Sequence, residues 1–173
     1  GAASAAARAI SDGNKLILGP LLSDDVQPVL ARAQPAHVPL ISFSNDRSVA
    51  GRDAFVMGVL PEQSIDRTVD YALAHGAKRF AAIVPNGGYG HHAQAALAAR
   101  VAKAGGVLVA TETYDRGNTS IISAADRLRT KGGFDTVLIA DGVRLSAIAA
   151  GSLKKAGTVL PHLLGTELWS GED

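Results

Sequence analysis

The 173-residue sequence contains no cysteine, which excludes disulfides and thiolate metal sites within the chain. Its 17 basic and 16 acidic residues nearly cancel, so no net charge draws it toward nucleic acid or an anionic membrane. No apolar stretch approaches the length of a membrane span, so the chain is not expected to be membrane-spanning. Aromatic residues are scarce, at 5%, which favours helices packed closely on a sheet over a β-sandwich.

Short apolar runs alternate with helical patterns along the whole chain. Most of these runs are apolar on successive residues, which is typical of strands buried on both faces of a parallel sheet. Repeated strand–helix alternation predicts right-handed βαβ units and a doubly wound α/β fold. The predicted strands span residues 15–21, 38–44, 54–60, 79–85, 106–114, 134–140 and 160–166.

The alternation also predicts how the chain is divided. Residues 59–165 hold four strand–helix repeats and are expected to form one nearly complete lobe. Residues 1–58 hold too few strands for a core of their own and are predicted to be part of a first lobe, with residues 166–173 crossing back toward it. Because the chain begins in the middle of this pattern, with a helix, we expect a fragment that lacks an N-terminal strand, a helix and an export signal.

In doubly wound folds, ligands bind beyond the carboxyl ends of the strands. One loop there, "PNGGYGHH" (85–92), has glycines that suit a phosphate cradle, but it matches neither the dinucleotide-binding nor the P-loop spacing. The alternative is a tight turn with positive φ at Gly87 or Gly88. Tyr89, with a flat apolar face and a hydroxyl, suits the wall of a small-molecule cleft. His91 and His92 are adjacent in a helix and point about 100° apart, so no shared metal is predicted.

Two earlier loops carry polar side chains after apolar strands. Ser23 and Asp24 precede a helix whose expected cap is Asp25, at a place where a ligand carboxylate would be favoured. Ser42 and Ser44, with Asn45 beside them, indicate a hydrogen-bonding loop rather than a serine nucleophile, since the nucleophile-elbow motif G-x-S-x-G is absent.

Two later loops carry acidic residues. Asp141 follows the strand predicted at 134–140, and Glu167 lies next to Trp169, the only tryptophan. An acidic group at a strand end beside an aromatic residue could receive an ammonium group, or could simply be solvated.

The chain contains, in this order, the six segments "LGPLLSDDVQPV", "VPLISFSND", "FVMGVLPEQ", "VPNGGYGHH", "DTVLIADG" and "LLGTELW". Together they resemble the type I periplasmic binding fold, in its leucine/isoleucine/valine-binding branch. The resemblance covers nearly the whole chain. Within this branch, "FSNDRSVAG" followed by "GVLPEQ" looks most like the penicillin-binding protein activator group of bacterial envelope lipoproteins.

The resemblance implies two lobes that close on a small ligand, with the family's C-terminal third absent from this chain. It places the ligand's carboxylate at Ser23–Asp24 and at 42–45, Tyr89 against the ligand, and Glu167 on its ammonium group. Asp24 and Asn45 stand where small residues are usual in the family, which weakens the inference to a plain aliphatic amino acid.

The predicted function is therefore a non-catalytic periplasmic protein of the ABC-transporter solute-binding type, closing on a small polar or amino-acid-like ligand. No cofactor or metal is implied, and the expected partner is an ABC permease. The alternative is an envelope lipoprotein, lipid-anchored through a missing N-terminus, that regulates peptidoglycan synthesis by contact with a penicillin-binding protein. The residues predicted to bind ligand are Ser23, Asp24, Ser42, Ser44, Asn45, Tyr89, Asp141 and Glu167.

Overall fold

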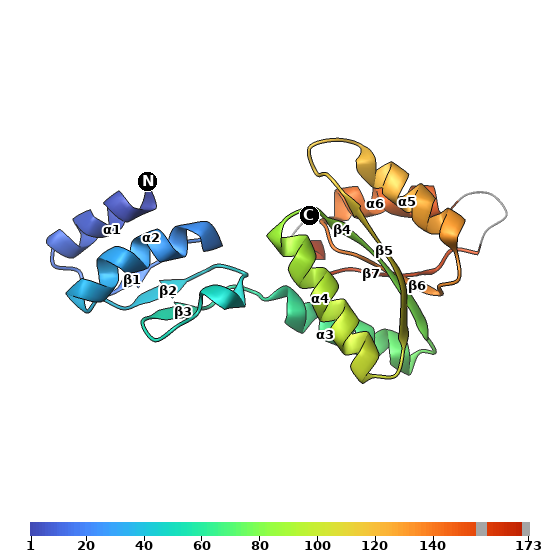
Figure 1. The fold of residues 1–173 in the computed structure, drawn as a ribbon, viewed down its shortest axis with the longest axis horizontal. Coiled ribbons are helices and arrows are strands. Elements are labelled where there is room, and N and C mark those ends of the chain that lie inside the picture. Colours follow the sequence, from blue (N-terminus) through green and yellow to red (C-terminus); the bar gives the residue numbers. More distant parts are fainter. Residues whose placement is uncertain (155–158, 171–173) are drawn as a thin grey trace. The chain divides into compact units, whose positions relative to one another are not determined.

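A computed structural model describes residues 1–154 and 159–170. The chain forms two compact units, Gly1–Leu60 and Pro61–Asp173 (Figure 1). Each contains a wholly parallel sheet with helices packed on it, so the predicted α/β class with parallel sheets is confirmed. Residues 171–173, the end of the segment predicted to cross back to the first lobe, lie outside the described residues.

The first unit is a three-stranded sheet, in the order β1-β2-β3, with helices on one face. Helices α1 and α2 lie side by side over that face (Figure 1). Ala6 of α1 and Val29 of α2 pack with Leu40 of β2, and all three side chains are buried. The elements of this unit are α1 (Ala2–Ser11), β1 (Ile17–Leu18), α2 (Ser23–Ala33), η1 (Gln34–Ala36), β2 (Leu40–Ser42), η2 (Arg47–Val49) and β3 (Ala54–Val56).

Two expectations for this unit were wrong. Its strands were predicted to be buried on both faces, yet Leu18 is 66% exposed and Phe55 is 55% exposed. Side chains alternate along a strand, so these two point away from α1 and α2, and no helix of this unit covers that face. Helix α2 also begins at Ser23 with Leu22 as its N-cap, so Asp25 is not the cap but lies in the first turn, where the helix dipole favours a carboxylate.

The second unit is a four-stranded parallel sheet in the order β5-β4-β6-β7. Because parallel strands point the same way, the loops after all four strands gather at one edge of the sheet. The elements of this unit are α3 (Pro61–Ala74), β4 (Arg79–Pro85), α4 (Gly88–Lys103), β5 (Val107–Tyr114), α5 (Ser120–Lys131), β6 (Thr136–Ile139), α6 (Val143–Leu153), β7 (His162–Leu164) and η3 (Glu167–Trp169).

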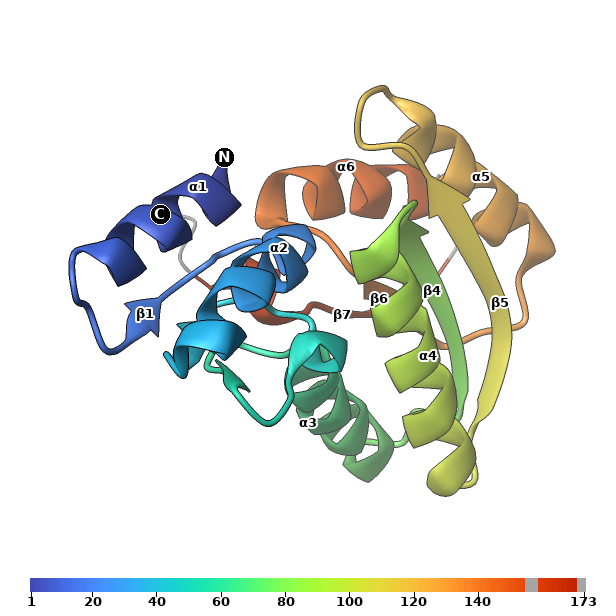
Figure 2. The same cartoon turned by 60° about the vertical axis from the view of Figure 1, so that its left-hand side comes forward.

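Helices cover both faces of this sheet (Figure 2). Helices α3 and α4 pack through Ile65 and Leu97 on the face that carries Phe80, while α5 packs through Leu128 on the face that carries Ile83. Every residue of β4 after its first is buried, which agrees with the predicted double coverage. This rigid sandwich fixes the positions of the loops at its carboxyl edge.

Asp135 holds the opposite edge of the sheet together. Its carboxylate accepts hydrogen bonds from the backbone N–H groups of Lys78 and Arg79 at 3.1 Å each and from the Thr136 hydroxyl at 2.7 Å. Burial raises the pKa of Asp135, but these hydrogen bonds and the nearby His162 outweigh burial and bring it below its ordinary value.

A group with a lowered pKa stabilises the fold above its unfolded-state pKa, and this contribution is lost as the pH falls through the folded-state pKa. Asp135→Asn should therefore lower the free energy of unfolding by about 1 kcal/mol near neutral pH. The gap to wild type should close as the pH is lowered past the ordinary aspartate range. Urea unfolding across a pH series measures this, with Asp66→Asn, at an exposed carboxylate on α3, as the control. A gap of constant size at every pH would contradict the assignment.

Candidate functional site

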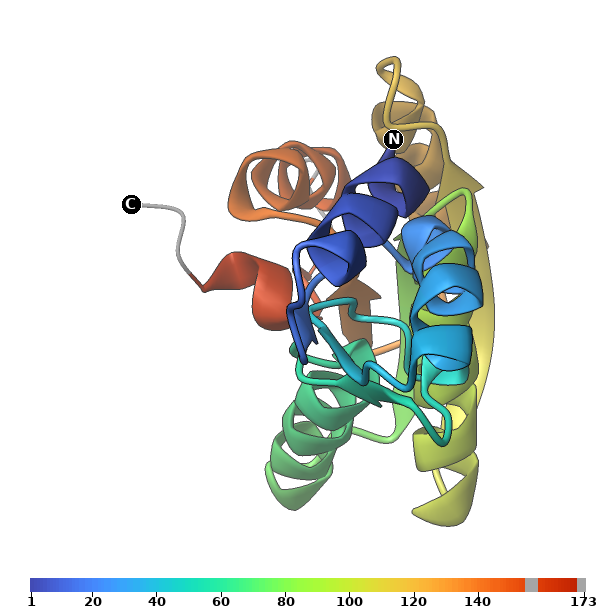
Figure 3. The ribbon, with the colours of Figure 1, turned by 90° about the vertical axis from the view of Figure 1, so that its left-hand side faces the viewer.

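Glu167, at the start of η3 just beyond β7, is held in one orientation by hydrogen bonds to two helices, α3 and α4. Its Oε1 accepts a hydrogen bond from the Tyr89 hydroxyl at 2.9 Å, and its Oε2 accepts one from the Ser64 hydroxyl at 2.8 Å. Its backbone N–H donates to Ser64 Oγ at 3.2 Å. Figure 3 shows η3, in red, close to α3, which carries Ser64. The carboxylate is thus fixed by two neutral hydroxyl donors while the residue stays partly exposed.

Tyr89 connects this carboxylate to Thr166. The Tyr89 and Thr166 hydroxyls are 2.8 Å apart, and since Tyr89 gives its one proton to Glu167, Thr166 donates to Tyr89. Burial raises the pKa of Tyr89 well above its ordinary value, and the charge and hydrogen bond of Glu167 raise it further, against opposing effects of Thr166 and Arg116. The phenol therefore remains a donor throughout the physiological pH range.

A second network lies around Asp141, just beyond β6. The buried carboxylate accepts hydrogen bonds from the Tyr114 hydroxyl, from Arg116 Nε at 2.7 Å and from the Gly142 N–H at 2.8 Å. Burial and then Asp141 raise the pKa of Tyr114, so its hydroxyl also stays protonated. The Arg116 guanidinium carbon lies 5.7 Å from the centre of the Tyr89 ring, within the range of a cation–π contact. Arg116 thereby joins this network to that of Glu167.

Trp169 is part of the same edge. Its indole Nε1 donates to Ser146 Oγ at 3.0 Å, and the Ser146 hydroxyl donates to the backbone carbonyl of Asp141 at 3.1 Å. A Cβ at Gly165 would lie 2.1 Å from the indole ring, so the ring packs directly against this glycine. The close contact holds the turn that presents Glu167.

The loop "PNGGYGHH" is a tight turn, as one of the two interpretations predicted. Gly87 has φ of 101°, which favours glycine, whereas Gly88 is the first residue of α4 and has no positive φ. His91 is exposed, and His92 Nδ1 lies 3.6 Å from Glu62 Oε1. Within the part of the chain that the structure describes, no three histidine or acidic residues form a metal-binding group.

The other predicted site residues belong to the first unit. Ser42 is buried, donates to the Pro20 carbonyl at 2.8 Å and accepts from the Ser44 N–H at 3.1 Å. Ser44 is also buried, and its hydroxyl accepts from the Asp46 N–H at 3.0 Å. The remaining three, at or near the same strand ends, are the half-buried Ser23 and the exposed Asp24 and Asn45. The structure thus brings the predicted residues of the second unit into one network and the two serines of the first unit into one loop.

Four residues of the network were not predicted from the sequence. Tyr114 and Arg116 lie at the carboxyl end of β5 and in the loop after it. The rule that ligands bind beyond the carboxyl ends of the strands, here called the strand-end rule, points to this loop, so the sequence contained a signal for both residues. Thr166 is adjacent to a predicted residue. Ser64 had no such signal, because it lies in the first turn of α3 and not after a strand of this sheet.

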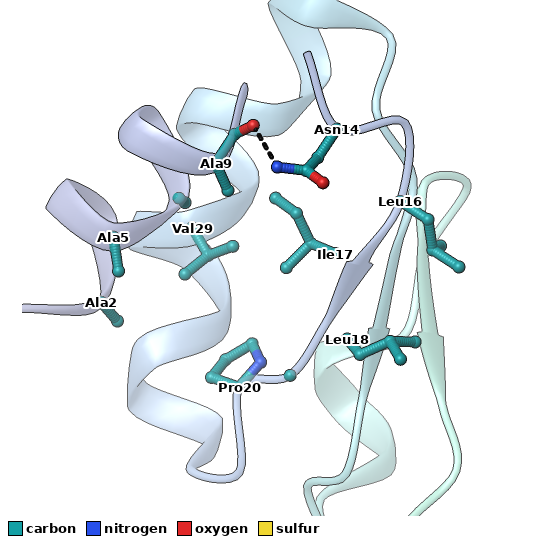
Figure 4. A pocket seen from close by; sticks show the side chains of 11 residues that line it. Ala2, Ala5, Ala9, Asn14, Leu16, Ile17, Leu18, Pro20 and Val29 are labelled. Carbon is teal, nitrogen blue, oxygen red and sulfur yellow. Dashed lines mark hydrogen bonds between the residues drawn. The ribbon is translucent and has the colours of Figure 1, made fainter. Parts of the chain in front are cut away.

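A cavity of about 500 Å³ lies elsewhere, in the first unit, between α1 and β1 (Figure 4). Its lining is almost wholly apolar, with side chains such as Ala5, Ile17 and Val29. The one polar side chain in the lining, Asn14, donates its amide to the Ala9 carbonyl at 2.8 Å. This cavity therefore offers nothing that would bind the charged groups of an amino-acid-like ligand.

The sequence profile of a family described as periplasmic binding protein matches residues 1–169. The chain belongs to this family. Membership implies a location in the periplasm or elsewhere outside the cytoplasm. In the described residues, no helix has the length and apolar character needed to cross a membrane. Among curated proteins, none matches the sequence.

Solved structures of leucine-binding, substrate-binding and solute-binding proteins share the fold of this chain. A leucine-binding protein of Thermotoga maritima has a TM-score of 0.71 at 19% identity, over 95% of this chain and 48% of its own. An ABC transporter substrate-binding protein of Desulfitobacterium hafniense in complex with Leu has a TM-score of 0.72 at 19% identity, and the match covers 95% of this chain and 50% of that protein. A solute-binding protein of R. palustris in complex with 4-hydroxybenzoate has a TM-score of 0.67 at 20% identity, and the match covers 80% of this chain and 38% of that protein. The chain thus spans half or less of the length of these proteins.

Proposed function

We propose that this periplasmic binding protein holds a small amino-acid-like ligand, with Glu167 accepting the ligand's ammonium group and Tyr89 packing against it. The observation that carries the proposal is the fixed, partly exposed carboxylate of Glu167. Its two side-chain donors are neutral hydroxyls, so its negative charge is oriented without being neutralised. No basic side chain among the described residues forms an ion pair with it.

An ammonium group fits this arrangement better than a neutral donor does. Each carboxylate oxygen has two lone pairs, and one protein hydroxyl occupies one lone pair on each. The remaining lone pairs can accept N–H groups, and a charge-assisted hydrogen bond is shorter and stronger than a neutral one. The aromatic face of Tyr89 would contact the carbon skeleton of the ligand, and would also attract its cation.

Within the first unit, the two serines of the loop at residues 42–45 use their hydroxyl protons differently. Ser42 gives its proton to the Pro20 carbonyl, whereas the Ser44 hydroxyl accepts a hydrogen bond from Asp46 and retains its own proton. Ser44 is therefore the serine of this loop that still has a hydroxyl proton to donate, and the exposed Asn45 lies next to it in the sequence. The leucine in the Desulfitobacterium hafniense complex, bound by a protein of the same fold, supports an amino acid as the ligand class.

A thermal-shift panel of L-amino acids, with benzoate and 4-hydroxybenzoate beside them, tests this function. At least one amino acid should raise the melting temperature, because saturation at 100 times Kd adds about 2.7 kcal/mol of stability. A panel in which no amino acid raises it would overturn the proposal. If a purified penicillin-binding protein then bound instead, the envelope-regulator function would replace it.

A further inference from the structure

A smaller cavity, of about 210 Å³, lies beside the candidate site within the second unit. It is formed by the loop between β5 and α5, by the start of α5 and by the first half of α6, and these two helices contribute four apolar side chains, Ile121, Ile122, Leu145 and Ile148. Two arginines, Arg116 and Arg144, line it, and the loop adds the polar residues Asn118 and Thr119. No carboxylate is among its lining residues, so its charged side chains are all positive.

The guanidinium of Arg116 is held in place at the wall of this cavity. Asp141 accepts its Nε–H and is itself fixed by the Tyr114 hydroxyl and the Gly142 N–H. Burial lowers the pKa of Arg116, but the hydrogen bond and charge of Asp141 outweigh burial and raise it above its ordinary value. The side chain is still 47% exposed, so the positioned cation is accessible to solvent.

The acidic groups near Arg116 do not occupy the cavity. Asp141 is not among the lining residues and binds Arg116 at Nε. Asp115 turns its carboxylate into its own loop, where it accepts the Gly117 N–H at 2.8 Å and the Asn118 amide at 3.4 Å. Two arginines and no acidic residue therefore line the cavity.

Tyr89 connects this cavity to the proposed ammonium site. Its hydroxyl is bonded to Glu167, and its ring lies 5.7 Å from the Arg116 guanidinium carbon. The negative Glu167 thus lies at the hydroxyl of Tyr89, and the positive Arg116 lies over its ring. A ligand packed along that tyrosine would meet both charges.

We propose that the cavity lined by Arg116 and Arg144 is an anion subsite, and that the ligand is an acidic amino acid whose side-chain carboxylate binds there. The inference rests on the proposed function, since it assumes an ammonium group at Glu167. Guanidinium groups bind carboxylates through two parallel hydrogen bonds, and Asp141 bonds Arg116 at Nε, not at its terminal nitrogens.

Calorimetric titration of the purified protein with L-glutamate, L-glutamine and L-leucine tests the subsite. Glutamate and glutamine have nearly the same shape, so their difference isolates the charge. Wild-type protein should bind glutamate about tenfold or more tightly than glutamine. Arg116→Gln should raise the Kd for glutamate by about tenfold or more, and the Kd for glutamine should stay within about twofold of the wild-type value. Arg127→Gln, at an arginine that pairs with Glu112 and does not line the cavity, should change neither affinity.

The outcomes separate the two proposals. Equal affinity for glutamate and glutamine in wild type, or an equal loss of both in Arg116→Gln, would overturn the subsite. The proposed function would still stand if leucine or glutamine bound. No binding of any of the three amino acids to wild type would overturn the subsite, whereas the proposed function would fail only if no L-amino acid of the thermal-shift panel raised the melting temperature. Arg144→Gln, with Arg144 exposed on α6, provides a second variant that does not disturb the Asp141 network, and it should also weaken glutamate selectively.

Discussion

Replacing Gly90 by alanine should destabilise the second unit by about 3 kcal/mol, although alanine is the better helix former. Gly90 lies in the first turn of α4, where a Cβ would be 1.7 Å from the carbonyl oxygen of Pro85 at the end of β4. A backbone atom of a buried strand cannot move aside as a flexible side chain would. The helix must therefore shift away from the sheet, which also displaces the turn that carries Tyr89.

Gly88→Ala is the matched control for this prediction. Gly88 lies two residues earlier in the same helix, has no positive φ, and no atom lies within 4 Å of where its Cβ would be. Alanine there should be neutral or slightly stabilising. Urea unfolding of the two variants, fitted with a common m-value, gives the comparison. Equal stability of the two variants would show that the close approach of Gly90 to Pro85 is not what positions α4.

Glu167→Gln should weaken binding of an amino-acid ligand by about tenfold to a hundredfold, the range expected when a hydrogen bond loses its charge. Glutamine keeps the length of the side chain and one oxygen that can accept from Tyr89 or Ser64, so the turn should survive. Its amide, however, has no negative charge with which to attract an ammonium group. Calorimetry with the amino acid that gives the largest thermal shift measures the change in Kd.

Glu112→Gln is the control for this substitution, because Glu112 is a carboxylate of the same unit that pairs with Arg127, outside the network of Glu167. It should leave the ligand Kd unchanged. An unaltered Kd in Glu167→Gln, with the variant folded, would remove Glu167 from the site. A loss of affinity in both variants would point to a general effect of charge and not to a direct contact.

Much of the fold could be predicted because the second unit follows the rule that a run of successive apolar residues marks a strand buried on both faces of a parallel sheet. Residues 79–85 were predicted as a doubly buried strand, and β4 covers these residues with six of its seven buried. The first unit departs from that rule. Its strands are only two or three residues long, shorter than the apolar runs that predicted them, because a strand ends where its ladder of backbone partners ends. An apolar run alone does not say how many residues find such partners.

The candidate site could be predicted only in part, because the sequence shows which residues follow strands but not which distant residues contact them. Tyr89, Asp141 and Glu167 follow three different strands of one sheet, and the strand-end rule selects them without knowledge of their contacts. What each does depends on neighbours distant in the sequence: Ser64, which orients Glu167, lies 103 residues before it. Asp141 was predicted to bind ligand, and its hydrogen bonds to Tyr114 and Arg116 support instead a role in positioning the arginine.

The most direct test of the ammonium site is a titration with an amino acid and with its 2-hydroxy counterpart, which differs only in having a hydroxyl in place of the ammonium group. Trp169, the only tryptophan, lies two residues from Glu167, and its fluorescence should report binding at that turn. The predicted result is a saturable change with the amino acid and a Kd weaker by about tenfold or more for the hydroxy acid. Equal affinities, or binding of hydroxy or aromatic acids alone, would contradict an ammonium site at Glu167.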